Sequence, residues 1–134
     1  MAILSTLLTS GTAAAQCLDY YTLPHVVGSR DGLGEPRALA QEGSRLYLAR
    51  GSSLTVVDAA DAASMPVLGS FAVSGQAEDV AVRWPYAYVT VRTSDPWFPR
   101  GLRVVDITTP SAMQGVDWLA VASAGAIVVE GPYA

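Results

Sequence analysis

The sequence contains no lysine, one cysteine and one histidine. A single cysteine, Cys17, cannot form a disulfide bond within the chain. A single histidine, His25, leaves no histidine cluster of the kind that holds zinc or copper, so we expect no metal site and no cofactor. Long apolar runs are also absent, since none reaches the roughly 18 residues of a membrane-spanning helix, and we expect no membrane span.

Charge is scarce as well. Charged residues make up 15% of the chain and apolar residues 51%, and the net charge is −4 at pH 7. This composition is too apolar for a disordered chain and suits one that buries much of its surface. Because the excess charge is negative, the chain as a whole repels a phosphate backbone, and we do not expect a nucleic-acid partner.

The first 15 residues have the features of a signal peptide. They carry short apolar runs and end in Ala13-Ala14-Ala15 before Gln16, which places small residues where signal peptidase requires them. We therefore expect export, with the mature chain starting at Gln16 and located in the periplasm, on the cell surface or outside the cell. The alternative is a cytosolic chain with a misassigned start, because no basic residue precedes the apolar run.

The rest of the chain is organised by an internal repeat. The sequence LRVVDI at residues 102–107 repeats LTVVDA at 54–59, 48 positions earlier. The sequence AYV at 87–89 repeats LYL at 46–48, 41 positions earlier. Repetition at this period is typical of arrays in which each unit is one supersecondary structure.

Each unit contains four short runs of strand-forming residues separated by turn residues, which is typical of β-propeller blades. A β-sandwich would expose one face of each strand, but residues 55–57 and 80–82 carry no charge on either face. We therefore predict an all-β fold with about two complete blades, each a four-stranded antiparallel sheet. The predicted strands are 38–41, 46–50, 54–58 and 67–73 in the first unit, and 79–83, 87–92, 102–107 and 116–121 in the second.

The units divide the chain into segments. We assign residues 30–74 to the first blade and 75–122 to the second. Residues 16–29 form the outer strand of a preceding or closing blade, because 25–29 match 66–70, and residues 123–134 start a third blade. A propeller needs at least four blades to close. The chain is therefore expected to be a fragment of a larger propeller, or to assemble with other copies.

The most specific sequence pattern is a tyrosine-bearing strand at 87–89, the run GLRVVDIT at 101–108 and the run VLGS at 67–70. This pattern resembles the LVIVD repeat of exported bacterial and archaeal proteins. The first unit departs from it, with Ser53-Leu54-Thr55 where Gly-Leu-Arg is usual. The resemblance implies a multi-bladed propeller at the cell surface or secreted, and it supplies no catalytic residues.

Candidate binding residues lie in an insertion of the second unit at 93–100. Antiparallel strands place this insertion on the same end of the blades as the loops 30–36 and 74–78, and rigid scaffolds often present binding residues on such loops. Aromatic residues there could stack on a sugar or peptide while the arginines pair with a carboxylate. Alternatively, Trp97 and Phe98 fold back over the blade edge. The candidates are Arg92, Asp95, Trp97, Phe98 and Arg100.

Two pairs of acidic residues are further candidates. Asp58 and Asp106 end equivalent strands, and we expect each to accept hydrogen bonds from the turn that follows it, as a structural role. Glu78 and Asp79 open the innermost strand of the second unit on the loop end, where two acids could hold a cation. Neighbouring strand residues face opposite ways, however, so solvated loop charges are the simpler interpretation.

These observations favour a non-enzymatic, exported propeller module that binds protein or glycan through its loop end. One alternative is a propeller enzyme, similar to a lactonase or quinoprotein, with catalytic residues in other blades. Against this, the first inner strand, residues 38–41, offers no metal ligand, and the chain has no Ser-His-Asp set. Another alternative is a structural role in a surface layer.

Overall fold

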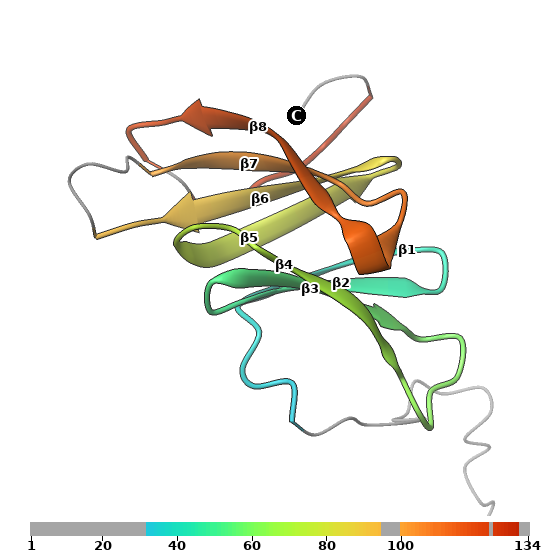
Figure 1. Cartoon of the computed structure of the whole chain (residues 1–134). Coiled ribbons are helices and arrows are strands. Elements are labelled where there is room, and N and C mark those ends of the chain that lie inside the picture. The colour runs from blue at the N-terminus through green and yellow to red at the C-terminus, as the bar shows by residue number, and fades with distance from the viewer. Residues whose placement is uncertain (1–31, 95–99, 124, 132–134) are drawn as a thin grey trace, which may run out of the picture.

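The structure is a computed structural model that describes residues 32–94, 100–123 and 125–131. In this part of the chain, eight strands form two four-stranded antiparallel sheets that lie one against the other (Figure 1). The strands are β1 (Ala38–Glu42), β2 (Arg45–Arg50), β3 (Ser53–Asp58), β4 (Val67–Ala72), β5 (Gln76–Arg83), β6 (Tyr86–Arg92), β7 (Gly101–Asp106) and β8 (Gln114–Ala120), and a short 3-10 helix, η1 (Pro110–Ala112), precedes β8.

Each sheet is a meander in which every strand pairs with the next, in the orders β1-β2-β3-β4 and β5-β6-β7-β8. The first two turns are tight because Gly43 and Gly51 adopt positive φ angles of 60° and 49°, which two-residue hairpin turns require. In the second sheet the corresponding first turn is Trp84-Pro85, which contains a cis peptide bond. Tight turns at these positions bring the predicted strands into register.

The core lies between the two sheets. Alternate residues of the first sheet, including Tyr47 and Leu54, point toward the second sheet, because side chains one apart on a strand face opposite ways. The fully or almost fully buried members are Tyr47, Ala49, Leu54 and Val56 from the first sheet and Val80, Ala87, Val89, Val91 and Val105 from the second. Apolar contact across this interface is the main term that holds the sheets together.

The prediction of an all-β fold made of two four-stranded antiparallel blades is confirmed. Strand β3 illustrates why the sequence pattern was informative. Its residues Leu54, Thr55, Val56 and Val57 are all at most 4% exposed, although successive residues point to opposite faces of the sheet. A strand buried on both faces needs apolar or small residues at every position, which is the pattern seen in the repeat.

Two local features differ from the expectation. Strand β5 begins at Gln76 and not at Asp79, because Gln76 pairs with Arg92 and a bulge between Ala77 and Asp79 absorbs Glu78. The connection to β8 also contains η1, which was not predicted. At this helix the two sheets come close together, and a Cβ atom added to Gly69 of β4 would overlap the carbonyl oxygen of Pro110.

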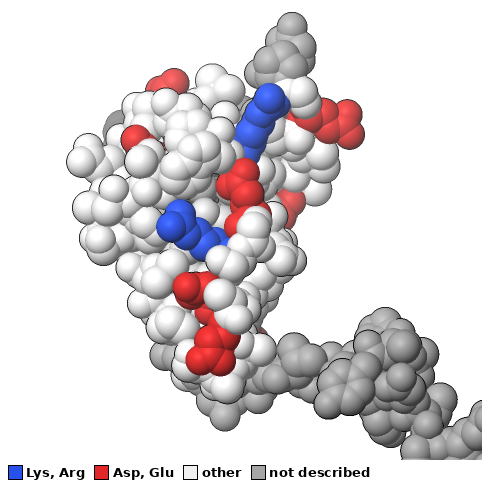
Figure 2. Space-filling model, turned by 90° about the vertical axis from the view of Figure 1, so that its right-hand side faces the viewer, with Lys and Arg blue, Asp and Glu red and all other residues white. Residues whose placement is uncertain are grey.

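Charged side chains of both signs are interspersed on the side of the molecule that carries the β1–β2 and β5–β6 turns (Figure 2). No helix in the described ranges is long and apolar enough to cross a membrane. The expected signal peptide at 1–15 and the expected outer strand at 16–29 lie outside these ranges, as do residues 124 and 132–134 of the segment expected to start a third blade.

Candidate functional site

The candidate site is a hollow of about 580 Å³ at the end of the sheets opposite the side shown in Figure 2. It forms where the connection from β4 to β5, the end of β6 and the residue before β7 meet. This is the end at which the loops 74–78 and 93–100 were expected to gather. The residues that line it are Ser74, Gly75, Gln76, Arg92, Thr93, Ser94 and Arg100.

The floor of the hollow depends on Gly75. A Cβ atom at this position would lie 2.6 Å from Cγ1 of Val91 and 3.1 Å from the carbonyl oxygen of Arg92. Only glycine therefore allows the connection between the two sheets to run so close to the end of β6. The preceding residue, Ser74, has a φ of 58°, an uncommon value for a non-glycine residue, and it turns the chain at the rim.

Arg92 is fixed by two neighbours. Its Nε atom lies 3.0 Å from Oε1 of Glu78, and its Nη2 donates a 3.0 Å hydrogen bond to Oε1 of Gln76. The same Glu78 oxygen accepts a 3.1 Å bond from Nη1 of Arg37, which precedes β1. Glu78 therefore joins an arginine of each sheet, and its side chain, 22% exposed, is more buried than those of the arginines at 43% and 44%.

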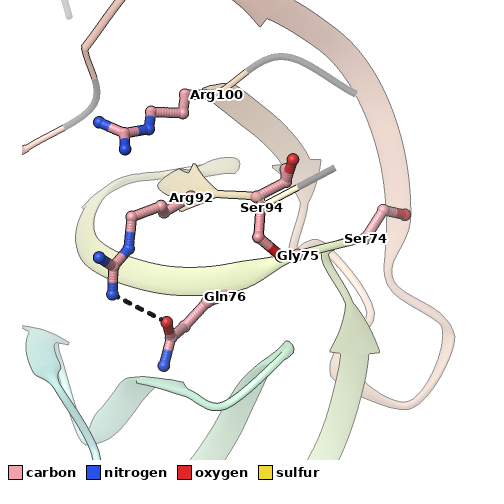
Figure 3. A pocket seen from close by; sticks show the side chains of 7 residues that line it. Ser74, Gly75, Gln76, Arg92, Ser94 and Arg100 are labelled. Atoms are coloured by element: carbon pink, nitrogen blue, oxygen red, sulfur yellow. Dashed lines mark hydrogen bonds between the residues drawn. The ribbon is translucent and has the colours of Figure 1, made fainter. Parts of the chain in front are cut away.

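Arg100 differs from Arg92 in its surroundings. Its side chain is exposed, and among the described residues it makes no hydrogen bond or ion pair. Figure 3 shows the guanidinium groups of Arg92 and Arg100 on the same side of the hollow, with Ser74 and Ser94 on the other side. Within the described residues, the guanidinium of Arg92 therefore has a counter-ion and that of Arg100 has none.

The charges of this region are positive on balance. The described charged residues that line the hollow or pair with its lining are Arg37, Arg92, Arg100 and Glu78, and the described lining residues include no acid. A guanidinium presents several N–H donors in a plane and binds carboxylates with two parallel hydrogen bonds. On a chain with a net charge of −4, this hollow thus carries a local excess of positive charge.

The structure places only part of the predicted site. Arg92 and Arg100 lie together at the hollow as described above. Asp95, Trp97 and Phe98 lie outside the described residues. Whether the two aromatic residues stack on a ligand or fold over the blade edge therefore stays a prediction. Ser74, Gln76 and Ser94 belong to the loops that were expected at this end, but they were not among the candidate binding residues.

Glu78 and Asp79 are not solvated loop charges. Both lie within β5, since the strand starts earlier than expected. Glu78 forms the two ion pairs, and Oδ2 of Asp79 accepts a 2.8 Å hydrogen bond from the backbone N–H of Ile127, in the segment after β8. The two acids face different partners, and in the described part of the chain no three His, Cys, Asp or Glu residues are placed to share a metal ion.

Asp58 and Asp106 hold equivalent turns. Oδ1 of Asp58 accepts a 2.9 Å hydrogen bond from the N–H of Ala60, and Oδ1 of Asp106 accepts one of 2.8 Å from Thr108. The hydroxyl and the N–H of Thr108 stabilise the ionised form and lower the pKa of Asp106 below its ordinary value of 3.8. These are local contacts within each turn, and neither aspartate lines the hollow of Arg92 and Arg100.

A second, shallower hollow lies between the β1–β2 and β5–β6 turns. Trp84 is 50% exposed there, and the guanidinium of Arg45 lies 6.0 Å from the centre of its ring. Oε1 of Glu42 accepts a 3.1 Å bond from the N–H of Trp84 and so links the turns of the two sheets. Burial raises the pKa of Tyr47 beside it. The contacts of Glu42 and Arg45 with Trp84 connect the two sheets, which is a structural role.

Comparison with known proteins gives one family. The family model described as LVIVD repeat matches residues 34–73 and again 74–116, more than half of the chain. Each match covers one of the two sheets except for the end of the last strand. No curated protein and no solved structure matches the chain.

Proposed function

The chain belongs to the LVIVD repeat family. We propose that it is an exported, non-enzymatic module that binds an acidic partner through its loop end. The observation that carries the proposal is the hollow beside Arg100. This arginine is exposed, lies at a concave surface and has no partner among the described residues. Arginine side chains in such positions are typical of sites that recognise carboxylates.

The scaffold supports this role. The lining residues come from the ends of β6 and β7 and from the connection into β5, all of which are anchored by paired strands. The close backbone contact at Gly75 and the bonds to Arg92 restrain this part of the lining. Less conformational freedom is therefore lost there when a ligand binds. The hydroxyls of Ser74 and Ser94 add polar groups that can hydrogen bond a sugar or a peptide.

The test is calorimetric titration of the full chain with two acidic probes, oligogalacturonate and poly-L-glutamate, and with neutral dextran. Arg100→Gln should weaken binding of the acidic probe by about tenfold or more, because a charge-assisted hydrogen bond is lost. Arg83→Gln is the matched control, since Arg83 is an exposed arginine at the other end of β5. Equal effects of the two variants, or equal binding of dextran, would contradict the proposal.

Export is part of the proposal, and it is supported by the alanine-terminated apolar stretch at 1–15. N-terminal sequencing of the chain from a bacterial host distinguishes the outcomes. A first residue of Gln16 in the extracytoplasmic fraction is expected, whereas an intact Met1 in the cytoplasm contradicts export.

Further blades, from the same protein or from other copies, are the proposed neighbours of the first sheet. Leu39, Leu46, Leu48 and Val57 line an apolar hollow on the face turned away from the second sheet, and Leu39 is 55% exposed. Their counterparts in the second unit are Val80, Ala87, Val89 and Val105, which the first sheet covers. Leu39→Glu should therefore reduce any association of the chain measured by sedimentation.

A further inference from the structure

The ion pairs of Glu78 have an effect beyond joining the two sheets. Arg92 is the only arginine in the lining that has a carboxylate partner among the described residues, at 3.0 Å from Nε. Gln76 occupies a second donor of the same guanidinium (Figure 3). Two donors of Arg92 are thus already used by groups of the protein itself, one of them the carboxylate that Arg92 shares with Arg37, whereas Arg100 has no such partner among the described residues.

The position of Glu78 is set by the fold. The bulge in β5 leaves Glu78 out of the regular pairing with β6, and Arg37 holds the same carboxylate oxygen from the first sheet. Glu78 is therefore restrained from two sides. An incoming anion would have to displace Glu78 to gain Nε of Arg92.

We propose that Glu78 is a resident counter-ion that makes the hollow selective for a single, singly charged carboxylate over a dianion such as a phosphate group. This inference rests on the proposed acidic partner and specifies its chemistry. Among the described lining residues, Arg100 has a guanidinium whose donors are all free, which suits the two oxygens of one carboxylate. A dianion gains the donors of a second guanidinium only by displacing Glu78 and Gln76 from Arg92. It is also repelled by Glu78 more strongly than a monoanion, and in a partly enclosed site this repulsion is screened less than in open water. A uronate and a glutamate side chain share the selected chemistry.

The experiment compares the wild-type chain with Glu78→Gln in calorimetric titrations with galacturonate and N-acetylisoglutamine, which each carry one carboxylate, and with inorganic pyrophosphate. We expect wild type to bind a carboxylate probe and to bind pyrophosphate weakly. Glu78→Gln should bind pyrophosphate about tenfold more tightly, with a steeper dependence on salt concentration, because Arg92 is released. The two carboxylate probes distinguish a glycan source from a peptide source.

Arg37→Gln is the matched control, because it breaks the same link between the sheets but leaves the Glu78–Arg92 pair in place. If Arg37→Gln gains pyrophosphate binding equally, loosening of the sheets is responsible and the inference is overturned. It is also overturned if wild type binds a carboxylate probe but Glu78→Gln leaves the pyrophosphate affinity unchanged. If wild type binds neither carboxylate probe and Arg100→Gln has no effect, the proposed function itself fails.

Discussion

At the scale of single residues, the aspartates that end β3 and β7 show how the same turn is maintained in both repeats. Each accepts a hydrogen bond from a backbone N–H two residues later. Such a bond needs a short side chain with an acceptor oxygen, which is why aspartate is found in both units despite the differences around it. The role of these residues followed from their repeated position alone.

Asp106 gives a prediction about pH. Hydrogen bonds from Thr108 lower its pKa in the folded chain below the ordinary 3.8, so its carboxylate contributes stability that is fully present above the ordinary pKa and is lost as the pH falls through the lowered value. Asp106→Asn should therefore melt at a lower temperature than wild type near neutral pH, and the difference should shrink as the pH falls below 3.8. Melting curves followed by circular dichroism across this range test it; a constant difference would exclude ionisation as the cause.

At the residue scale, the sequence located the two arginines at one end of the blades but not their partners, and the binding role of the arginines stays a prediction. Arg92 and Arg100 flank an insertion, and the repeat alone locates that insertion at one end of the blades. The role of Glu78 depends on a bulge that no hydrophobic pattern reveals. One sequence signal was present: Arg37 and Glu78 are 41 positions apart, at equivalent places in successive units and with opposite charges.

At the scale of elements, the sheets are determined by runs of apolar residues and by their turns. All eight strands could be predicted from their apolar runs and turns. Strands such as β3, which are buried on both faces, have apolar or small residues at successive positions and no alternation of polar with apolar residues. Strand ends were less certain, since Gln76 looks like a loop residue and is held in β5 by pairing with Arg92. Helix η1 could not be predicted, because three residues carry no helical period.

Gly69 is the critical residue of strand β4. It is the glycine of the VLGS run at 67–70, and it allows the strand to touch the backbone of Pro110, which lies in η1 of the second unit. Gly69→Ala should destabilise the chain by about 1–3 kcal/mol in urea denaturation, because the overlap is with backbone, which cannot move aside cheaply. Gly125→Ala is the control, since nothing lies within 4 Å of the added Cβ; equal losses would show that the close contact is unimportant.

At the scale of the whole molecule, the two sheets share one core. The chain should therefore unfold as one unit, although its tryptophans, at 84, 97 and 118, all belong to the second repeat. Leu54→Ala removes a fully buried side chain of the first sheet and should cost about 2–5 kcal/mol. The urea transition reported by tryptophan fluorescence should shift by as much as the transition reported by circular dichroism.

Leu39→Ala is the comparison variant for this test, because it makes the same change in the same sheet at a residue that is 55% exposed. Its effect should stay below about 1 kcal/mol. If Leu54→Ala shifts only the circular dichroism signal, the sheets unfold separately and the shared core does not couple them.

The ion pair between Arg37 and Glu78 restricts how this gene can grow by duplication. The two residues occupy the same place in successive units and lie side by side. Copying the first unit twice in a row would set guanidinium against guanidinium, and copying the second would set carboxylate against carboxylate. Tandem expansion that preserves this contact must therefore copy the units as a pair or change a charge.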